Sequence, residues 1–545
     1  MKISFLGAGS VGFTQTLVRD ILKVKKLQNI EISLHDISRS NLLMVAELIQ
    51  KDIKANNLPT KLSIDPIRKE SIRNAKYIIS CVRVGGLEAF ETDISIPLKY
   101  GIDQCVGDTI CAGGIMYGQR NIPVILDFCK DIKKYAKKNA LFLNYANPMA
   151  MNTWAANEIG KVNTIGLCHG VQGGAKLIED SLNIPFGKMK YSCSGINHMT
   201  WYLDLKYKGK KITKEQLSKS LKKHKKFSRD EKVRIDVLDK FGYFSTESNG
   251  HLSEYLPWYR RTQKDVKKWS SLSNWIHGET GGYLRVCNEK RNWFVEDYPK
   301  YLKNSGIKLK DYKRSTEHGS YIIEAIETGK KYRGHFNVIN KKTISNLDDD
   351  CVIESTGYVD SKGIKMIEGV NLPLQCASLC STSIDVQRMA VRAAVKGDIE
   401  LLKLAVLQDP LVSSVCSSEE VWQMVDEMLV AQAQWLPQYQ SKINSINIAK
   451  KKDRFVAYAN IYDVLLGKIE IDKAPSNFIN AIQKSLENTE SNIDELNYAC
   501  VKLEILAGID SLKKDQSIRN NIPVSYTHLR AHETVLDLVC RLLLE

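Results

Sequence analysis

Short apolar runs alternate with amphipathic stretches of helical period through about the first 200 residues of the chain. Five runs are predicted as strands: residues 2–6, 31–35, 77–82, 140–144 and 164–167. The last three are apolar enough to be parallel strands buried on both faces. Helical patterns lie between the runs, at residues 41–56 and 121–138. This alternation predicts a doubly wound α/β domain, whose ligands collect at the carboxyl ends of its parallel strands.

The pattern changes near residue 196 to mixed strands and long helices, including 384–407 and 418–435. We therefore expect a first domain over residues 1–195 and an α+β domain over 196–445. Helical periodicity continues through a segment without an assigned role, residues 446–522. Residues 523–545 resemble a translated adapter sequence more than a native tail, so they are left out of the fold prediction.

The first strand leads into a glycine-rich turn that is typical of dinucleotide binding. Gly7, Gly9 and Gly12 follow the strand at G-x-G-x-x-G spacing, and an amphipathic helix comes directly after them. The glycines let backbone amides approach a pyrophosphate, and the helix N-terminus adds a partial positive charge. Asp36 ends the second strand, 36 − 12 = 24 residues past the last glycine. An acid there suits a free ribose 2′-hydroxyl, so NAD is predicted in preference to NADP.

Two pairs of residues have the character of ligands for a soft divalent metal. Cys168-His169 follows the strand at 164–167, and Asn197-His198 comes about 30 residues later. Taken alone, Cys168 could equally be a small buried hydrophobe, and His198 a hydrogen-bonded core histidine. A hydride-accepting nucleotide together with a metal that polarises hydroxyls indicates redox chemistry on a polyol or a sugar.

Composition and charge argue against a nucleic-acid-binding, a membrane-spanning or a secreted protein. The chain has 545 residues and a net charge of +16, with lysines concentrated in residues 206–232 and 450–454. No aromatic-rich recognition motif accompanies these lysines, so we expect solvated surfaces and no nucleic-acid partner. No apolar run of about 18 residues is present, and Met1 leads straight into a strand, so neither a membrane span nor a signal peptide is expected. Thirteen cysteines without a framework spacing predict reduced thiols in the cytoplasm.

A succession of motifs from residue 1 to about 440 resembles glycoside hydrolase family 4. The motifs are Gly7–Ser10, Arg83–Glu88, Asp103–Thr109, Leu143–Ala150, Gly166–Gly170 and Gly195–His198. The resemblance implies an N-terminal NAD-binding domain like that of lactate and malate dehydrogenases. It also implies a C-terminal α+β domain for substrate, metal and oligomer contacts. Ser10 and Arg83 join the three glycines and Asp36 as residues of the implied NAD site.

Members of this family use NAD and a divalent metal, usually manganese, to hydrolyse glycosides without net redox change. NAD oxidises the sugar at C3, and the resulting ketone acidifies the proton on C2. A base removes that proton, the group at C1 is eliminated, water adds, and the hydride returns. The scheme differs from the usual glycosidase mechanism with two carboxylates.

The resemblance assigns roles to the residues around the metal. Cys168 and His198 become the metal ligands, and sugar hydroxyls complete the shell. Asn147 is expected to contact the sugar, although it could instead stabilise an Asn-Pro turn. His169 takes the position of the proton donor to the leaving group, with support of the metal site as its alternative. Asp108 resembles the acid that raises the basicity of the catalytic base, but could simply cap the next segment.

The catalytic base is expected in the polar, aromatic segment at residues 247–257. Tyr255 is the first choice and Glu254 the second, because the family often uses tyrosine and some members a carboxylate. Tyr255 would need a lowered pKa, and otherwise it merely packs. Arg314, in another motif of the family, could reach the sugar or the cofactor, or pair with Glu317.

The Cys-His pair at 168–169 resembles family members that act on unphosphorylated α-glycosides. Residues 377–439 look most like the α-galactosidases, with α-glucosidase and α-glucuronidase or α-galacturonidase activities as alternatives. An NAD-dependent dehydrogenase of a hydroxyacid or polyol shares the fold and is a further alternative. Besides a glycosidase and a dehydrogenase, the third class of function is a nucleotide-binding protein without catalytic activity. A small-molecule α-glycoside is the expected partner, and relatives imply a homodimer or homotetramer.

Overall fold

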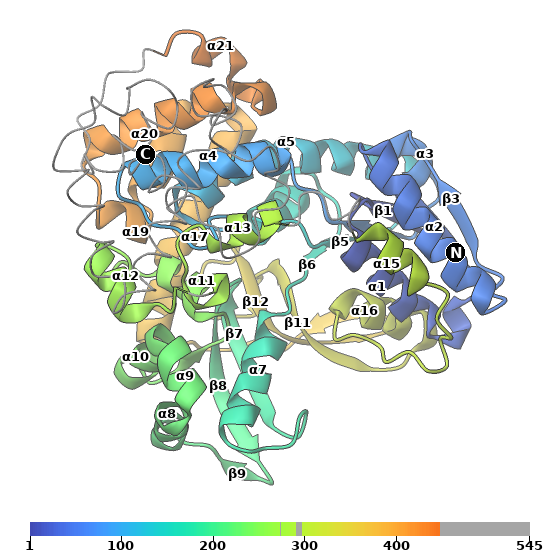
Figure 1. The fold of residues 1–545 in the computed structure, drawn as a ribbon, viewed down its shortest axis with the longest axis horizontal. Helices are drawn as coiled ribbons and strands as arrows, with labels where there is room; N and C mark the ends of the chain where they lie inside the picture. Colours follow the sequence, from blue (N-terminus) through green and yellow to red (C-terminus); the bar gives the residue numbers. More distant parts are fainter. Residues whose placement is uncertain (273, 290–296, 447–545) are drawn as a thin grey trace, which may run out of the picture.

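A computed structural model describes residues 1–272, 274–289 and 297–446, and a sheet of 13 strands forms its centre (Figure 1). Six parallel strands lie in the order β3-β2-β1-β4-β5-β6. Their bounds are β1 Lys2–Leu6, β2 Glu31–His35, β3 Lys61–Ile64, β4 Tyr77–Ser80, β5 Leu141–Asn144 and β6 Thr164–Gly166. This order, with strands numbered along the chain, is that of a doubly wound dinucleotide-binding sheet, so the predicted α/β fold is confirmed.

Seven α-helices connect or flank these strands. They are α1 Val11–Leu22, α2 Arg39–Ala55, α3 Arg68–Ile72, α4 Gly86–Lys99, α5 Cys111–Tyr135, α6 Met149–Trp154 and α7 Gly170–Ser181; η1 Lys25–Leu27 and η2 Ala155–Ile159 are short. Helix α5 begins ten residues before the predicted start at 121. Its first half is buried on every side and therefore has no amphipathic period. The three glycines at 113, 114 and 118 also make that stretch of sequence look like a loop.

The second half of the chain continues the same sheet with antiparallel strands. They are β7 Lys190–Ile196, β8 Met199–Tyr207, β9 Lys210–Lys211, β10 Phe244–Ser245, β11 Tyr332–Ile339, β12 Val352–Asp360 and β13 Gly363–Met366. Strand β11 joins the two halves, because Asn337 pairs with Gly166 at the end of β6. The carboxyl ends of β5 and β6 therefore face residues from both halves of the chain.

The helices of the second half surround this extension of the sheet. They are α8 Lys214–Lys223, α9 Lys225–Asp230, α10 Lys232–Phe241, α11 Asn249–Tyr255, α12 Gln263–Trp269, η3 Trp275–His277, α13 Gly282–Glu289, α15 Tyr298–Lys303, α16 His318–Thr328, α17 Leu374–Lys396, α18 Ile399–Leu407, α19 Pro410–Ser413, α20 Ser418–Ala431, η4 Ala433–Trp435, η5 Pro437–Tyr439 and α21 Gln440–Ile443. The prediction of one helix over 384–407 is wrong. Gly397 adopts a left-handed φ of +62° and separates α17 from α18.

The two largest hydrophobic cores of the described residues link elements from both halves of the chain. One lies around β1 and β2 and includes side chains of α1, α2 and α16, so a helix from the second half packs against the half that holds the parallel strands (Figure 1). The larger core joins α5 and α6 to α17, α18 and α20 and buries Trp154 and Trp201. Within the described residues, no helix is both long enough and apolar enough to cross a membrane. The segments predicted over 446–522 and 523–545 lie, from residue 447 on, outside the described part of the chain.

Candidate functional site

The turn between β1 and α1 has the form that dinucleotide binding requires. Gly7 adopts a φ of +82°, and its N–H donates to the carbonyl oxygen of His35 at the end of β2. Ser10 is exposed and stands at the N-cap of α1 without a side-chain capping bond, and Gly12 is exposed in the first turn. The helix N-terminus thus opens to solvent beside the carboxyl ends of the parallel strands, where a pyrophosphate fits.

Asp36 lies directly against this turn. Its Oδ2 accepts the N–H of Gly9 at 2.7 Å, and its Oδ1 accepts the N–H of Ser38 at 2.8 Å. The carboxylate is therefore fixed at the end of β2, at the place where a ribose of a bound dinucleotide is held. The turn, the helix and this acid fit NAD.

Three side chains from separate elements meet beyond the carboxyl end of β6. Cys168 follows β6, and its Sγ is 3.4 Å from Nε2 of His198 in the two-residue turn between β7 and β8. Oε2 of Glu247, just before α11, is 3.6 Å from the same nitrogen. The three potential ligand atoms all lie within 4.8 Å of one another, so one ion could touch all three. Glu247 lies in the segment from which only a base was predicted, and its place in this cluster was missed.

The protonation states of this cluster suit a divalent cation. Burial lowers the pKa of His198 to about 3, so its imidazole is neutral and can donate a lone pair to a metal. Burial also raises the pKa of Cys168 well above its usual value, so the thiolate form needs a cation beside it. A thiolate, an imidazole and a carboxylate together form a donor set for a transition metal.

His251 connects the cluster to a neighbouring polar group, and the sequence did not single it out. Its ring stacks on that of His198 with centroids 4.2 Å apart, and its Nδ1 is 3.8 Å from Oε1 of Glu247. Its Nε2 is 4.0 Å from Oδ1 of Asp108. The signal that could have found it is its spacing from Tyr255, because a step of four places two side chains on one face of a helix, here α11.

Asp108 gathers two further predicted residues. The guanidinium of Arg83 donates to Oδ2 of Asp108 at 3.1 Å, and the amide of Asn147 is 3.2 Å from both carboxylate oxygens. The guanidinium carbon of Arg83 also lies 4.6 Å from the ring centroid of Phe90. Arg83, predicted for the NAD site, is thus placed where it orients Asp108 and, through it, the amide predicted to bind the sugar.

The two candidates for the base have different surroundings. Both oxygens of Glu254 accept backbone N–H groups: Oε1 from Cys105 and Val106, and Oε2 from Gly107. Tyr255 is 2% exposed, and its ring meets that of His198 edge-on with centroids 6.4 Å apart. Burial raises the pKa of Tyr255 well above its usual value, whereas a base needs a lowered one.

His169 is exposed beside the site, and Arg314 forms its polar contacts with Ser320 and Glu324. The His169 side chain is 72% exposed, and its Nδ1 is 3.5 Å from Oε1 of Glu317. Arg314 forms an ion pair with Glu324 and donates through Nε to Ser320 at 3.1 Å. The alternative partner that we expected for Arg314, Glu317, is therefore wrong, and the structure gives Arg314 no contact with Cys168 or His198.

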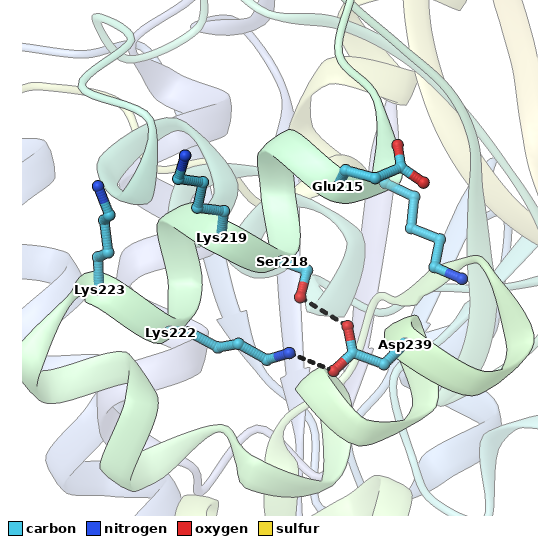
Figure 2. A pocket seen from close by; sticks show the side chains of 7 residues that line it. Glu215, Ser218, Lys219, Lys222, Lys223 and Asp239 are labelled. Atoms are coloured by element: carbon cyan, nitrogen blue, oxygen red, sulfur yellow. Dashed lines mark hydrogen bonds and ion pairs between the residues drawn. The ribbon is translucent and has the colours of Figure 1, made fainter.

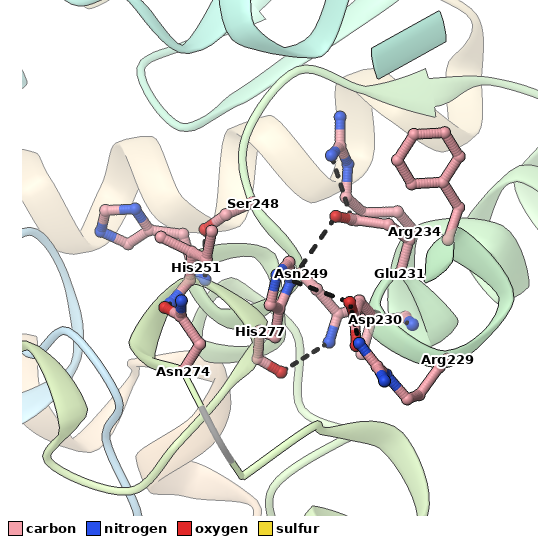
Figure 3. A network of polar contacts seen from close by, with 12 residues as sticks. Arg229, Asp230, Glu231, Arg234, Ser248, Asn249, His251, Asn274 and His277 are labelled. Atoms are coloured by element: carbon pink, nitrogen blue, oxygen red, sulfur yellow. Dashed lines mark hydrogen bonds and ion pairs between the residues drawn. The ribbon is translucent and has the colours of Figure 1, made fainter. Parts of the chain in front are cut away.

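A polar network fixes helix α11, which carries His251 and Tyr255 (Figure 3). The amide of Asn249 donates to the carbonyl oxygens of Trp269 and His277 at 3.0 and 3.1 Å. Ser248 caps α11 by accepting the N–H of His251 at 3.3 Å. The start of α11, with Glu247 immediately before it, is thereby held in one orientation.

Several lysines of residues 206–232 lie on the exposed side of α8. Figure 2 shows a hollow there, lined by Lys214, Glu215, Ser218, Lys219, Lys222, Lys223 and Asp239. Lys222 Nζ is 2.6 Å from Asp239 Oδ2, and Ser218 donates to the other oxygen at 2.6 Å. Cations and carboxylates are mixed here, as on a solvated helix. The absence of a nucleic-acid partner stays a prediction.

We expect the free energy of unfolding to fall in acid because of buried histidines behind the site. Burial lowers the pKa of His318 to about 3 and that of His335 well below its usual value. The unfolded chain therefore binds more protons than the folded chain below about pH 6.5. Each histidine then removes up to ~1.4 kcal/mol of stability per pH unit as the pH falls. Urea unfolding between about pH 7 and pH 5 measures this slope.

His335→Phe should reduce the slope, since phenylalanine keeps the ring packing on Tyr191 but does not titrate. His224→Gln, at an exposed position, should leave it unchanged. An equal slope in His335→Phe and the unsubstituted chain would contradict the prediction.

Both halves of the chain match family models of known proteins. The model described as "Family 4 glycosyl hydrolase" matches residues 2–184, and "Family 4 glycosyl hydrolase C-terminal domain" matches residues 193–412. An alpha-galactosidase of Rhizobium meliloti (strain 1021) is 58% identical over 451 residues, which cover 83% of this chain and 91% of the relative. An alpha-galactosidase of Bacillus subtilis (strain 168) is 33% identical over 442 residues, covering 80% and 99%. The solved 6-phospho-beta glucosidase of Thermotoga maritima, with manganese, NAD+ and glucose-6-phosphate, shares the fold with a TM-score of 0.65 and 22% identity, covering 80% and 99%.

Proposed function

The chain belongs to family 4 of the glycosyl hydrolases, and from this premise we propose that it hydrolyses unphosphorylated α-galactosides with NAD and Mn²⁺. The observation that carries the proposal is the distance of 3.4 Å between Cys168 and His198 beyond the carboxyl end of β6, in the parallel sheet whose strand β1 ends at the nucleotide turn. The sugar class rests on the 58% identity to an alpha-galactosidase. An α-glucoside or an α-galacturonide is the alternative substrate.

The residues that would hold the two groups are those of the nucleotide turn with Asp36, and Cys168 with His198. When bound, NAD supplies reversible oxidation at C3 of the sugar, and the metal supplies positive charge beside the sugar hydroxyls. The chain's own contribution is placement: His198 stays neutral through burial and keeps a lone pair available.

Asn147 and His169 act on different parts of the substrate. Asp108 accepts the amide of Asn147 and so turns its carbonyl oxygen toward a sugar hydroxyl, while Arg83 holds Asp108. His169 is exposed at the N-cap of α7, where it can protonate a departing group, and Glu317 lies within ion-pair distance of its ring.

Tyr255 is the better candidate for the base at C2. The oxygens of Glu254 are engaged by three backbone N–H groups, so that carboxylate anchors the loop at residues 105–107. Tyr255 faces His198, so a cation held there would stabilise its phenolate against the effect of burial.

Hydrolysis of p-nitrophenyl α-galactoside tests the proposed function. After removal of bound nucleotide and metal under reducing conditions, we expect release of p-nitrophenol only when NAD and Mn²⁺ are both added, with no net NADH. Release without either addition would indicate a conventional hydrolase. Net NADH from a hydroxyacid or polyol, without glycoside cleavage, would indicate a dehydrogenase. Parallel assays with the α-glucoside and α-galacturonide rank the sugars.

We further propose a reducing, cytoplasmic location and a homodimer or homotetramer. The location is supported by the described cysteines, all of which are free thiols, and by the need for Cys168 as a thiolate. Light scattering measures the assembly. Activity retained after thiol oxidation would oppose the location argument.

A further inference from the structure

We propose that Glu247 is a third protein ligand of the metal, completing a Cys168–His198–Glu247 site; the inference rests on the metal site of the proposed function. The three side chains come from the end of β6, the β7–β8 turn and the residue before the N-cap of α11. Their potential ligand atoms lie within 4.8 Å of one another, which is the spread of donors around one ion.

The two oxygens of Glu247 have separate surroundings. Oε1 accepts the N–H of Ser248 at 2.9 Å and lies 3.8 Å from Nδ1 of His251. Oε2 is left to face Nε2 of His198 at 3.6 Å. One oxygen is thus held by surrounding groups while the other points at the cluster, which is how second-sphere contacts orient a ligating carboxylate.

The negative charge of the largely buried Glu247 carboxylate would also be compensated by a bound cation. Its side chain is 16% exposed, and its ion partners among the described residues are His198 and His251, with no lysine or arginine in range. A carboxylate largely removed from water needs a compensating positive charge. A divalent ion bound by one thiolate, one carboxylate and one neutral imidazole forms a centre without net charge. The oxygen donor also adds preference for manganese to a pair of softer ligands.

Gly170 gives independent evidence that space is kept for this carboxylate. A Cβ atom at position 170 would lie 2.5 Å from Oε2 of Glu247 and 3.7 Å from Sγ of Cys168. Glycine therefore permits the carboxylate to approach the thiol. With three protein ligands, positions remain for two hydroxyls of a sugar, as an open catalytic site requires.

The test is Mn²⁺ affinity, measured from the EPR signal of free Mn²⁺ during titration of the metal-stripped, NAD-loaded full chain. Glu247→Gln keeps the size of the side chain and an acceptor for Ser248 but removes the charge. We expect Mn²⁺ affinity to fall by about 10- to 100-fold or more while NAD affinity is unchanged. Glu317→Gln, a neighbouring carboxylate beside His169, is the matched control and should retain Mn²⁺ affinity.

Unchanged Mn²⁺ affinity in Glu247→Gln would overturn the inference. If that variant does not fold, Gly170→Ala decides the question by the same criterion, because its methyl group displaces Oε2 without removing any ligand. Cys168→Ser is measured in parallel. Loss of Mn²⁺ binding in Cys168→Ser but not in Glu247→Gln leaves the proposed function intact and rejects only the third ligand, whereas tight binding in both rejects the metal site itself.

Discussion

Replacing Cys168 by serine is expected to lower kcat/KM for an α-galactoside by about 10²- to 10³-fold or more. Serine keeps the size of the side chain, but its hydroxyl is a poor substitute for a thiolate, so the divalent ion is lost. The transition state then lacks positive charge beside the sugar oxygens, where an enediolate develops. Steady-state kinetics at saturating NAD, with metal content measured on the same preparation, gives the result.

Cys351→Ser is the matched control for this substitution. The Cys351 thiol donates to the carbonyl oxygen of Asp348, and a serine hydroxyl can make the same bond away from the cluster. This control should keep both activity and metal. A Cys168→Ser variant that turns over at the rate of the control would exclude the thiolate from the mechanism.

Asp108→Asn is expected to lower both activity and stability. Asp108 accepts from Arg83 and from Asn147, and its side chain is 2% exposed. Asparagine keeps one acceptor but turns an NH₂ group toward the other donor, and it leaves the Arg83 guanidinium without its counter-charge. We expect a loss of about 3 kcal/mol in the free energy of unfolding. We also expect a fall of about 10²-fold in kcat/KM, because Asn147 is no longer oriented. Urea unfolding and kinetics measure the two effects.

Asp52→Asn separates these two effects. Asp52 on α2 is equally enclosed and pairs with Arg19 on α1 at 2.7 Å, so its loss should cost comparable stability. It touches none of the residues placed in the site, so kcat/KM should be retained. An equal fall of kcat/KM in both variants would show that the Asp108 effect is only structural.

Five of the six parallel strands were predictable because their apolar runs are local and uninterrupted. Strand β3 was missed, because its four residues are only partly buried and carry no apolar run. Strand β2 spans the predicted residues, and β4 and β6 differ only at their carboxyl ends, where the chain turns into the site. Helix α5 was less predictable, since burial on every side removes the periodicity on which a helix prediction depends. The division between α17 and α18 at Gly397 was missed because an isolated glycine within a helical pattern is often tolerated.

The candidate site also contains residues that the sequence could identify and contacts that it could not. Gly7, Gly9 and Asp36 are recognisable because each stands at a strand end, where a short-range motif fixes the geometry. Cys168 and His198 could be singled out by residue type and motif, but their separation of 3.4 Å is a property of the folded sheet. His251 carried only its helical spacing from Tyr255, which says that the two share a face of the helix but not what that face contacts, and Glu247, before the N-cap, carried no such signal.

By itself, the sequence determined the α/β class, the nucleotide turn and the residue types able to hold a metal. These depend on interactions between neighbours along the chain, which local spacing records. Only the tertiary structure decided that Glu247 lies beside Cys168 and that Arg83 pairs with Asp108. Those contacts join distant segments, and their geometry depends on how α11 lies against His198 in the β7–β8 turn, which no local pattern encodes.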